Sequence, residues 1–153
     1  MMQRPIFNDV LQIAIVVRNL DASVEAYENG YGIGPWEFHE FLPGDVEDLV
    51  KDDAPAQYGM RIALTTVGRV QWELIQPIDD RSNYAEFLRE KGEGVHHIQV
   101  AVDDYDDALN ALREKGNTVV VGGTFDGTRL AYLSTDRDLG VITEILDMPA
   151  EPG

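Results

Sequence analysis

The 153-residue sequence contains no cysteine. This absence excludes a disulfide scaffold, a thiolate metal site and a thiol nucleophile, and it suits a reducing compartment, so we expect a cytoplasmic protein. Long hydrophobic runs are also lacking. No stretch approaches the ~20 apolar residues of a transmembrane helix, and the first residues contain no apolar segment of signal length. We therefore expect no membrane partner.

Basic residues are scarce. The chain has 12 Lys and Arg against 28 Asp and Glu, which gives a formal net charge of −16, and the basic positions are scattered rather than clustered. Such a charge repels the phosphate backbone of nucleic acids, which we exclude as partners. We interpret the acidic excess as a solubilising property of the surface. A chain of this length buries a sufficient core without a disulfide or a structural metal.

The sequence does contain an internal repeat. Residues 12–17 and 97–102 are apolar, largely β-branched runs that predict buried strands, and each precedes a segment with apolar residues at helical spacing. We expect Asp21 to cap the first helix, and Asp104 or Asp106 to cap the second. Three further strands are predicted in each half: residues 36–41, 60–67 and 70–75 in the first, and 118–121, 128–134 and 141–146 in the second.

This repeat predicts an α+β fold in which two βαβββ modules form a cupped mixed sheet. The first module covers residues 10–78, the second covers residues 95–147, and residues 79–94 between them hold a linker helix. Together they form a single domain over residues 1–153. The modules can pair within one chain or across a dimer. Open-sided sheets commonly bury an edge or face against a partner, so we expect a homodimer.

An acidic segment, residues 42–57, separates the second and third strands of the first module. Its Pro43-Gly44 pair and Pro55 argue against a continuous regular element. A loop of this length is often a functional lid. The alternative is a mobile surface excursion without a role.

Four polar residues occupy equivalent positions of the two modules. Alternation along the first strand places Gln12 on the concave face of the sheet, opposite the apolar face that meets the helix, and His97 is its equivalent in the second module. In the last strand of each module, Glu73 is the equivalent of Glu144. The repeat therefore predicts two pairs of polar side chains on one face.

A glutamate within an apolar strand is costly to bury unless a cation compensates its charge. One imidazole nitrogen, two carboxylates and an amide oxygen form a donor set that suits zinc, nickel, cobalt, manganese or magnesium. Taken singly, each residue has a simpler interpretation, as a solvent-facing glutamate or a hydrogen-bonded core histidine. The pairing by repeat favours one divalent metal ion, bound by Gln12, Glu73, His97 and Glu144.

Further residues are candidates for substrate binding. Gln99 and Gln71 share the concave face by alternation. Arg61 and Arg129 occupy equivalent positions on the third strands, where they can hold an anionic substrate. The alternative for this arginine pair is a set of salt bridges to the many surrounding acids.

The chain resembles the vicinal oxygen chelate superfamily, which includes glyoxalase I, methylmalonyl-CoA epimerase, ring-cleaving dioxygenases and bleomycin-resistance proteins. The most specific similarity is residues 84–98, where a helix and the sequence Gly94-Val95-His96-His97-Ile98 resemble the linker helix and Gly-[VIL]-His-His-Ile strand of the epimerases. The strands around Glu73 and Glu144 also match. The resemblance implies a glyoxalase-like fold.

For the site, the resemblance implies that the second histidine of the pair is the ligand, so that His96 points away. Gln12, Glu73, His97 and Glu144 resemble the ligand set of one group of glyoxalase I enzymes, although the epimerases usually carry His in place of Gln12. The resembling glyoxalases use the last-strand glutamate partly as ligand and partly as base. Glu144 is accordingly the expected base, with Glu73 as the alternative.

These features predict a divalent-metal-dependent isomerase, epimerase or lyase that acts by metal-assisted proton abstraction on a small oxygenated metabolite. A non-catalytic protein that binds a drug or antibiotic on the same fold is the alternative. The two interpretations differ in whether small-molecule binding depends on the metal.

Overall fold

The computed structural model describes residues 4–148; residues 1–3 and 149–153, the ends of the predicted single domain, lie outside the described part. Among residues 4–148, no helix is long and apolar enough to cross a membrane. The elements occur in this order: β1 (Asp9–Val16), α1 (Leu20–Glu25), the π-helical turn η1 (Ala26–Gly30), β2 (Glu37–Phe41), β3 (Glu47–Lys51), β4 (Ala54–Pro55), β5 (Met60–Val67), β6 (Val70–Pro77), α2 (Asn83–Lys91), β7 (Gly94–Ala101), α3 (Tyr105–Glu114), β8 (Val119–Phe125), β9 (Thr128–Leu133), α4 (Asp136–Leu139) and β10 (Ile142–Asp147).

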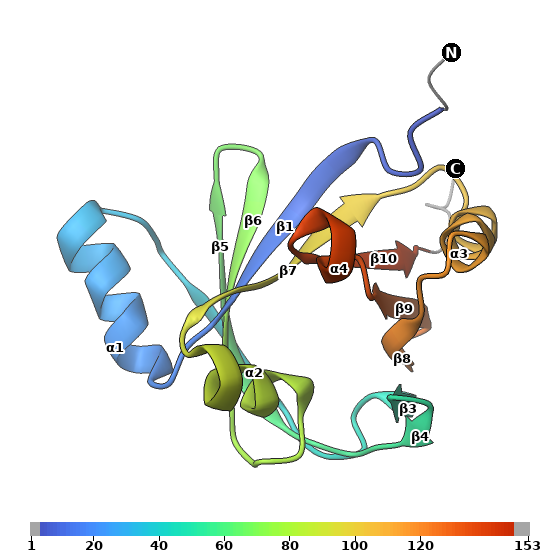
Figure 1. Cartoon of the computed structure of the whole chain (residues 1–153). Helices are drawn as coiled ribbons and strands as arrows, with labels where there is room; N and C mark the ends of the chain where they lie inside the picture. Colours follow the sequence, from blue (N-terminus) through green and yellow to red (C-terminus); the bar gives the residue numbers. More distant parts are fainter. Residues whose placement is uncertain (1–3, 149–153) are drawn as a thin grey trace.

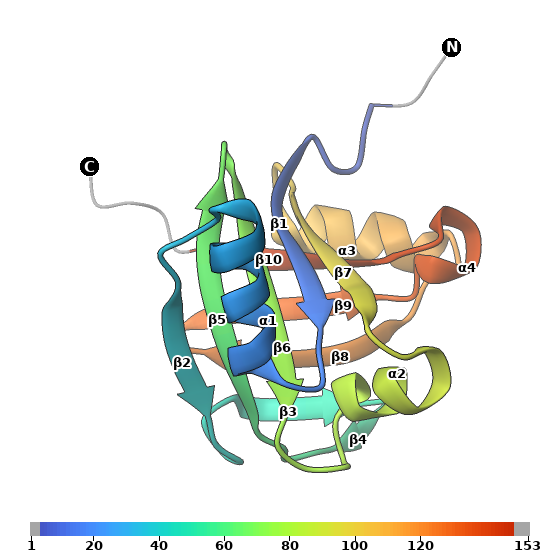
Figure 2. The same ribbon diagram turned by 90° about the vertical axis from the view of Figure 1, so that its left-hand side faces the viewer.

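The strands form one mixed sheet in the order β2-β5-β6-β1-β7-β10-β9-β8-β3-β4. The first strand of each module is parallel to its last strand, in the pairs β1–β6 and β7–β10, and the modules meet where β1 pairs antiparallel with β7. The modules thus pair within one chain. Helices α1 and α3 lie on opposite sides of the molecule, each against its own module (Figures 1 and 2). The α+β architecture predicted from the repeat is confirmed.

The helices begin at polar caps. Asn19, rather than the expected Asp21, caps α1, because its side chain accepts a hydrogen bond from the Ala22 N–H. Asp104 caps α3 by accepting from the Asp107 N–H, as one of the two expected alternatives. In each helix the inward residues pack on the convex face of the sheet, where they form an apolar cluster with strand residues of the same module.

Residues 42–57 were expected to form a long loop without a continuous regular element, and the structure places two short strands in this segment. The strands are β3 and β4, and β3 pairs with β8 of the other module. Glycines on β8 allow this close approach: a Cβ at Gly123 would lie 2.8 Å from Val46 Cγ1 and 3.2 Å from the Glu47 carbonyl oxygen. The segment therefore links the first module to the far edge of the second.

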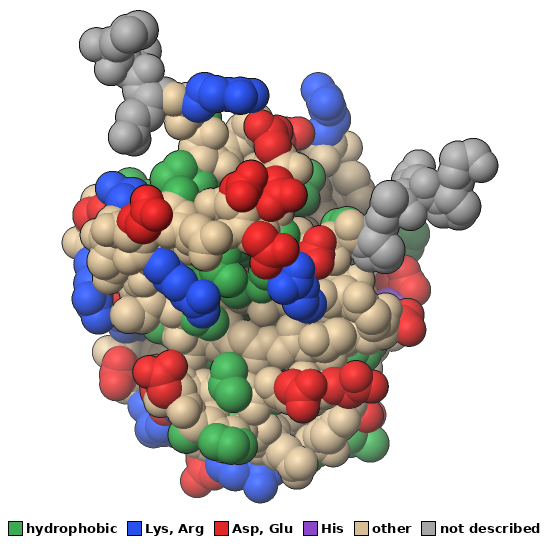
Figure 3. All heavy atoms as spheres, turned by 90° about the vertical axis from the view of Figure 1, so that its right-hand side faces the viewer, with side chains coloured by type: hydrophobic (Ala, Val, Ile, Leu, Met, Phe, Trp, Pro, Cys, Tyr) green, Lys and Arg blue, Asp and Glu red, His purple; other side chains and the backbone are tan. Residues whose placement is uncertain are grey.

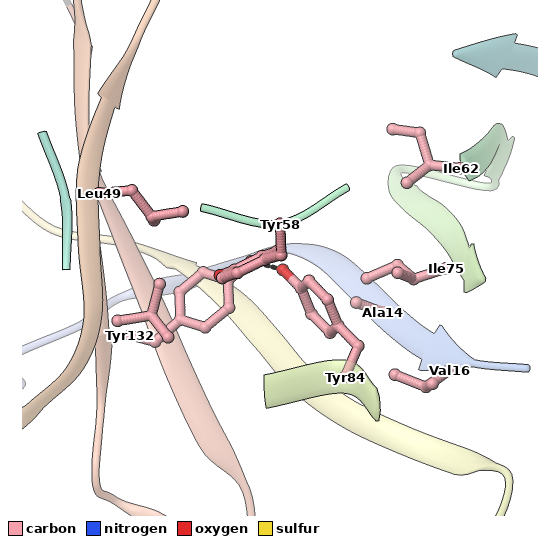
Figure 4. Packing of buried hydrophobic residues seen from close by; sticks show 9 residues of the cluster. Ala14, Val16, Leu49, Tyr58, Ile62, Ile75, Tyr84 and Tyr132 are labelled. Atoms are coloured by element: carbon pink, nitrogen blue, oxygen red, sulfur yellow. Dashed lines mark hydrogen bonds between the residues drawn. The ribbon is translucent and has the colours of Figure 1, made fainter. Parts of the chain in front are cut away.

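The inside of the cup is filled by side chains from both modules, α2 and residues 42–59. Tyr84 of α2 and Tyr132 of β9 point toward each other there, with their hydroxyl oxygens 2.6 Å apart (Figure 4). The buried members of this cluster are Ala14, Val16, Leu49, Tyr58, Ile62, Ile75, Tyr84, Val121 and Tyr132. At the rim, Phe41 of β2 contacts Phe125 of β8 edge to face. The concave side is thus a packed interior.

The outer face that carries α3 is charged. Acidic and basic side chains lie next to one another there, and hydrophobic ones form only small separate groups (Figure 3). Arg129 on β9 is an example, because it bonds both Asp106 of α3 and Asp147 of β10. This surface agrees with the interpretation of the acidic excess as solubilising.

Gly59 provides a test of how tightly the segment before β5 is packed. An added Cβ would lie 2.6 Å from Ile78 Cδ1 and 2.8 Å from the Phe41 carbonyl oxygen. Because the carbonyl is part of the backbone, it cannot move aside as the end of a side chain can. We expect Gly59→Ala to lower the free energy of unfolding by about 1–3 kcal/mol, measured by urea denaturation. Gly30→Ala is the matched control, because a Cβ there has no neighbour within 4 Å. Equal effects of the two substitutions would contradict this packing.

The buried tyrosine pair predicts a non-additive double-mutant cycle. Tyr84→Phe or Tyr132→Phe alone leaves the other hydroxyl buried without this partner, which we expect to cost about 1–3 kcal/mol of stability. The double variant removes both hydroxyls, so its loss should be smaller than the sum of the single losses. Urea denaturation of the four proteins measures the coupling, and strictly additive losses would show that the hydroxyls do not interact.

Candidate functional site

The four residues expected at a metal site lie on the four central strands of the sheet. Gln12 is on β1, Glu73 on β6, His97 on β7 and Glu144 on β10, and these strands are neighbours in the order β6-β1-β7-β10. In register, Ala14 pairs with both Glu73 and His97. The first and last strands of the modules become the middle of one sheet, and the structure therefore brings all four side chains to its concave face.

The group is buried and close. His97 Nε2 lies 3.3 Å from Glu144 Oε1 and 3.9 Å from Glu73 Oε1, and the three side chains are 0%, 7% and 13% exposed, respectively. His97 Nε2 has no hydrogen-bond partner although it is fully buried. A buried polar atom without a partner is destabilising, so this nitrogen marks a position where a binding partner would be favourable.

Two glutamines orient the group. The Gln12 amide donates to Gln71 Oε1 over 2.6 Å, and the Gln99 amide donates to Glu144 Oε1 over 3.1 Å. The structure thus places both glutamines predicted for substrate binding beside the four central residues. Because Gln12 uses its nitrogen as a donor here, its oxygen is left to act as a ligand.

Burial shifts the protonation of Glu73. Burial raises the pKa of Glu73 to about 7, an effect that His97 opposes and that Glu144 increases. The contribution of Glu144 is repulsion between two carboxylates that both lie within 4 Å of His97 Nε2. A cation between them would remove that repulsion.

The position of His96 corrects the sequence interpretation that it points away. The pairing of β1 with β7 shifts between Ala14–His97 and Ile15–Val95, so His96 is an extra residue in a β-bulge. Its ring lies beside that of His97, with the two Nδ1 atoms 2.9 Å apart. Strict alternation along a strand places neighbours on opposite faces, and the bulge breaks that rule here.

Two tyrosines near the group were not predicted from the sequence. The Tyr132 ring centroid is 4.5 Å from that of His97, and burial raises the pKa values of Tyr84 and Tyr132 well above the usual value, so both stay protonated. Alternation along β9 from the outward Arg129 places Tyr132 on the concave face, which is the signal that could have identified it. Tyr84 lies on α2, which crosses the cup. Alternation along a strand cannot identify it, because it is on a helix.

Arg61 and Arg129 are not brought to this group. Arg61 bonds Asp21 at the start of α1, and Arg129 bonds Asp106 and Asp147. Both side chains are on the helix-covered outer face. Of the two roles that the sequence left open for this pair, their contacts are those of salt bridges.

The donor set suits a divalent cation, although its side chains are not arranged around one. Among residues 4–148, no group of three or more His, Cys, Asp or Glu side chains is disposed to hold a metal ion as the side chains stand. The unpartnered Nε2 of His97, flanked by two buried carboxylates, is nevertheless what a cation would satisfy. An imidazole with carboxylate and amide oxygens fits the borderline and hard divalent ions.

Comparison with curated proteins finds two relatives of similar length. The chain is 29% identical to the ethylmalonyl-CoA/methylmalonyl-CoA epimerase of Cereibacter sphaeroides over 112 residues, which cover 72% of this chain and 73% of that protein. It is 25% identical to the uncharacterized protein YqjC of Bacillus subtilis over 143 residues, which cover 92% of each chain.

Solved structures share the fold. The methylmalonyl-CoA epimerase of Mycobacterium tuberculosis matches with a TM-score of 0.66 at 24% identity, over 99% of this chain and 95% of that one. The methylmalonyl-CoA epimerase of Streptomyces coelicolor, in complex with 2-nitronate-propionyl-CoA, matches with a TM-score of 0.59 at 26% identity, over 94% and 99%.

A family match covers most of the sequence. Residues 11–132 match the Glyoxalase/Bleomycin resistance protein/Dioxygenase superfamily, whose enzymes are typically metal-dependent. The matched residues include three of the four central site positions, Gln12, Glu73 and His97. With this match and a sheet that agrees with the solved epimerases, the chain belongs to the Glyoxalase/Bleomycin resistance protein/Dioxygenase superfamily.

Proposed function

We propose that the protein is a divalent-metal-dependent isomerase, epimerase or lyase. It removes a proton from the carbon next to a carbonyl group of a small oxygenated metabolite. The observation that carries the proposal is the buried, unpartnered His97 Nε2 between the carboxylates of Glu73 and Glu144. Family membership supports it, because superfamily enzymes are typically metal-dependent.

In this proposal Gln12, Glu73, His97 and Glu144 hold the ion, which is zinc, nickel, cobalt, manganese or magnesium. When bound, such an ion polarises a substrate oxygen and makes the adjacent C–H more acidic. Glu144 is the proposed base and Glu73 the alternative. The hydrogen bond from Gln99 occupies Glu144 Oε1, and this fixes the direction of its carboxylate.

The surrounding residues exclude water and supply hydrogen-bond donors. Tyr84 and Tyr132 close the concave side over the group, and their protonated hydroxyls can donate to a substrate oxygen once their mutual bond opens. The cup is packed as it stands, so substrate entry requires α2 or residues 42–59 to move.

Acyl-CoA thioesters are the first substrate class to test. One of the two relatives is an ethylmalonyl-CoA/methylmalonyl-CoA epimerase, and one solved epimerase is in complex with methylmalonyl-CoA and NH4+. The carbon between the two carbonyl groups of such a compound carries an acidic proton, which suits the proposed chemistry. Free 2-methyl dicarboxylic acids form a second class, which requires no site for the phosphates of CoA.

Metal binding is the first prediction of this proposal. We expect about one divalent ion per chain in the wild type after remetallation and desalting, and an affinity at least about 10-fold weaker in Glu144→Gln and Glu73→Gln. Elemental mass spectrometry and titration with Co²⁺ measure this. Glu40→Gln is the matched control, because Glu40 is exposed on the edge strand β2. No ion in any of the folded proteins would contradict the proposal.

Proton exchange is the second prediction. In deuterated water, the metal-loaded wild type should exchange the proton next to the carbonyl of an accepted thioester, and Glu144→Gln should lower the rate about 10²–10⁴-fold if Glu144 is the base. Mass spectrometry of the recovered substrate measures the incorporation. A comparable loss in Glu73→Gln alone, at equal metal content, would assign the base to Glu73.

The two experiments also separate the enzyme from the non-catalytic binding protein. A non-catalytic binding protein would bind a small molecule tightly in the presence of a metal chelator. It would not exchange the proton next to the carbonyl of that molecule.

A further inference from the structure

The environment of His97 leads to an inference about its neighbour, and it rests on the proposed metal site. If His97 Nε2 is a ligand, it must present a lone pair, so the ring proton must be on Nδ1. His96 Nδ1, 2.9 Å away, is the atom within hydrogen-bond distance of His97 Nδ1. Because both atoms are ring nitrogens, one must donate and the other accept.

We infer that His96 is a positioning residue, which accepts the Nδ1–H of His97 and thereby fixes the tautomer and ring orientation of His97 with Nε2 facing Glu73 and Glu144. The opposite arrangement would place the His97 proton on Nε2. Its nearest acceptor, Glu144 Oε1 at 3.3 Å, forms no hydrogen bond with it in this geometry.

The bulge explains why two adjacent histidines reach the same side of β7. A regular strand would direct His96 to the convex face, where it could not contact His97 Nδ1. The extra residue between the Ala14–His97 and Ile15–Val95 pairs turns it inward instead. There its ring is held between Tyr84 and Phe87 of α2, with ring centroids 4.9 and 5.3 Å away.

The inference extends to Asn83 at the start of α2. When His96 accepts at Nδ1, its own proton must be on Nε2. The amide nitrogen of Asn83, itself a donor, lies 3.4 Å from that atom, whereas the amide oxygen of Asn83 is buried without a partner. The amide oxygen of Asn83 should therefore face His96. Rotation of the Asn83 amide by 180° exchanges its oxygen and nitrogen, so the tautomer of His96 determines which one faces the ring. A chain of two hydrogen bonds then connects α2, through His96, to the ligand His97.

The test uses the tautomers of the metal-free protein and the metal affinity. The chain has three histidines, so a long-range ¹H–¹⁵N spectrum of the ¹⁵N-labelled protein can resolve each ring. We expect His97 to carry its proton on Nδ1 in the wild type. In His96→Leu we expect this preference to be lost and the affinity for Co²⁺ to fall about 10–100-fold.

His96→Gln tests whether the hydrogen bond, rather than packing, is responsible. Its side-chain oxygen can accept the Nδ1–H of His97, so it should restore most of the affinity and the tautomer, whereas a purely structural role predicts no such rescue. His39→Leu is the matched control, since His39 is exposed and its Nε2 lies 3.1 Å from Glu37 Oε1 on the same strand. Urea denaturation identifies variants whose losses come from unfolding.

Two results would overturn the inference: a wild-type His97 protonated on Nε2, or an unchanged Co²⁺ affinity in folded His96→Leu. Failure of the proposed function is a separate result. If the wild type binds no divalent ion, the metal site is refuted, while the spectrum of the metal-free protein still decides the tautomer.

Discussion

Burial of two carboxylates beside one imidazole, at the centre of the sheet, is the constraint on which the rest of the structure depends. Charged groups are stable in such a position only if their surroundings compensate them. The glutamine amides on β1 and β7, the tyrosine hydroxyls above and the bulged histidine alongside supply polar contacts for an otherwise apolar face. The inner core thus surrounds a group of ionisable side chains, whereas the clusters beneath α1 and α3 consist of aliphatic and aromatic residues.

The internal repeat explains how this centre arises. Strands β1 and β7 are equivalent, as are β6 and β10, and the antiparallel β1–β7 junction relates them by approximate twofold symmetry. Symmetry duplicates the positions but not the residues. Gln12 and His97 differ in chemistry at equivalent positions. The proposed metal site therefore offers one imidazole nitrogen rather than two, and it is asymmetric although the strands that carry it are related by the repeat.

Much of the fold was predictable from the sequence, because the modules have clear strand alternation and helix periodicity. Strand β5 was predicted with its observed bounds, and α2 lies within residues 79–94, where the linker helix was expected. The concave positions of Glu73 and Glu144 followed from the same alternation. The hairpin β3–β4 was not predictable, because its regularity depends on glycines of β8 that are distant in sequence. The side reached by His96 was also missed, because a bulge depends on register between strands rather than on local pattern. The expected homodimer stays a prediction.

The pairing of β3 with β8 has a consequence for how the chain can be rearranged. Segment 42–57 belongs to the first module by sequence, yet it forms the edge of the second, so the modules are joined both through α2 and through this hairpin. Domain swapping usually needs one hinge to open. Here, exchange of a module between two copies would have to break the β1–β7 junction and the β3–β8 ladder together. The β3–β8 ladder thus adds a second set of backbone contacts to those that hold the two modules together within this chain.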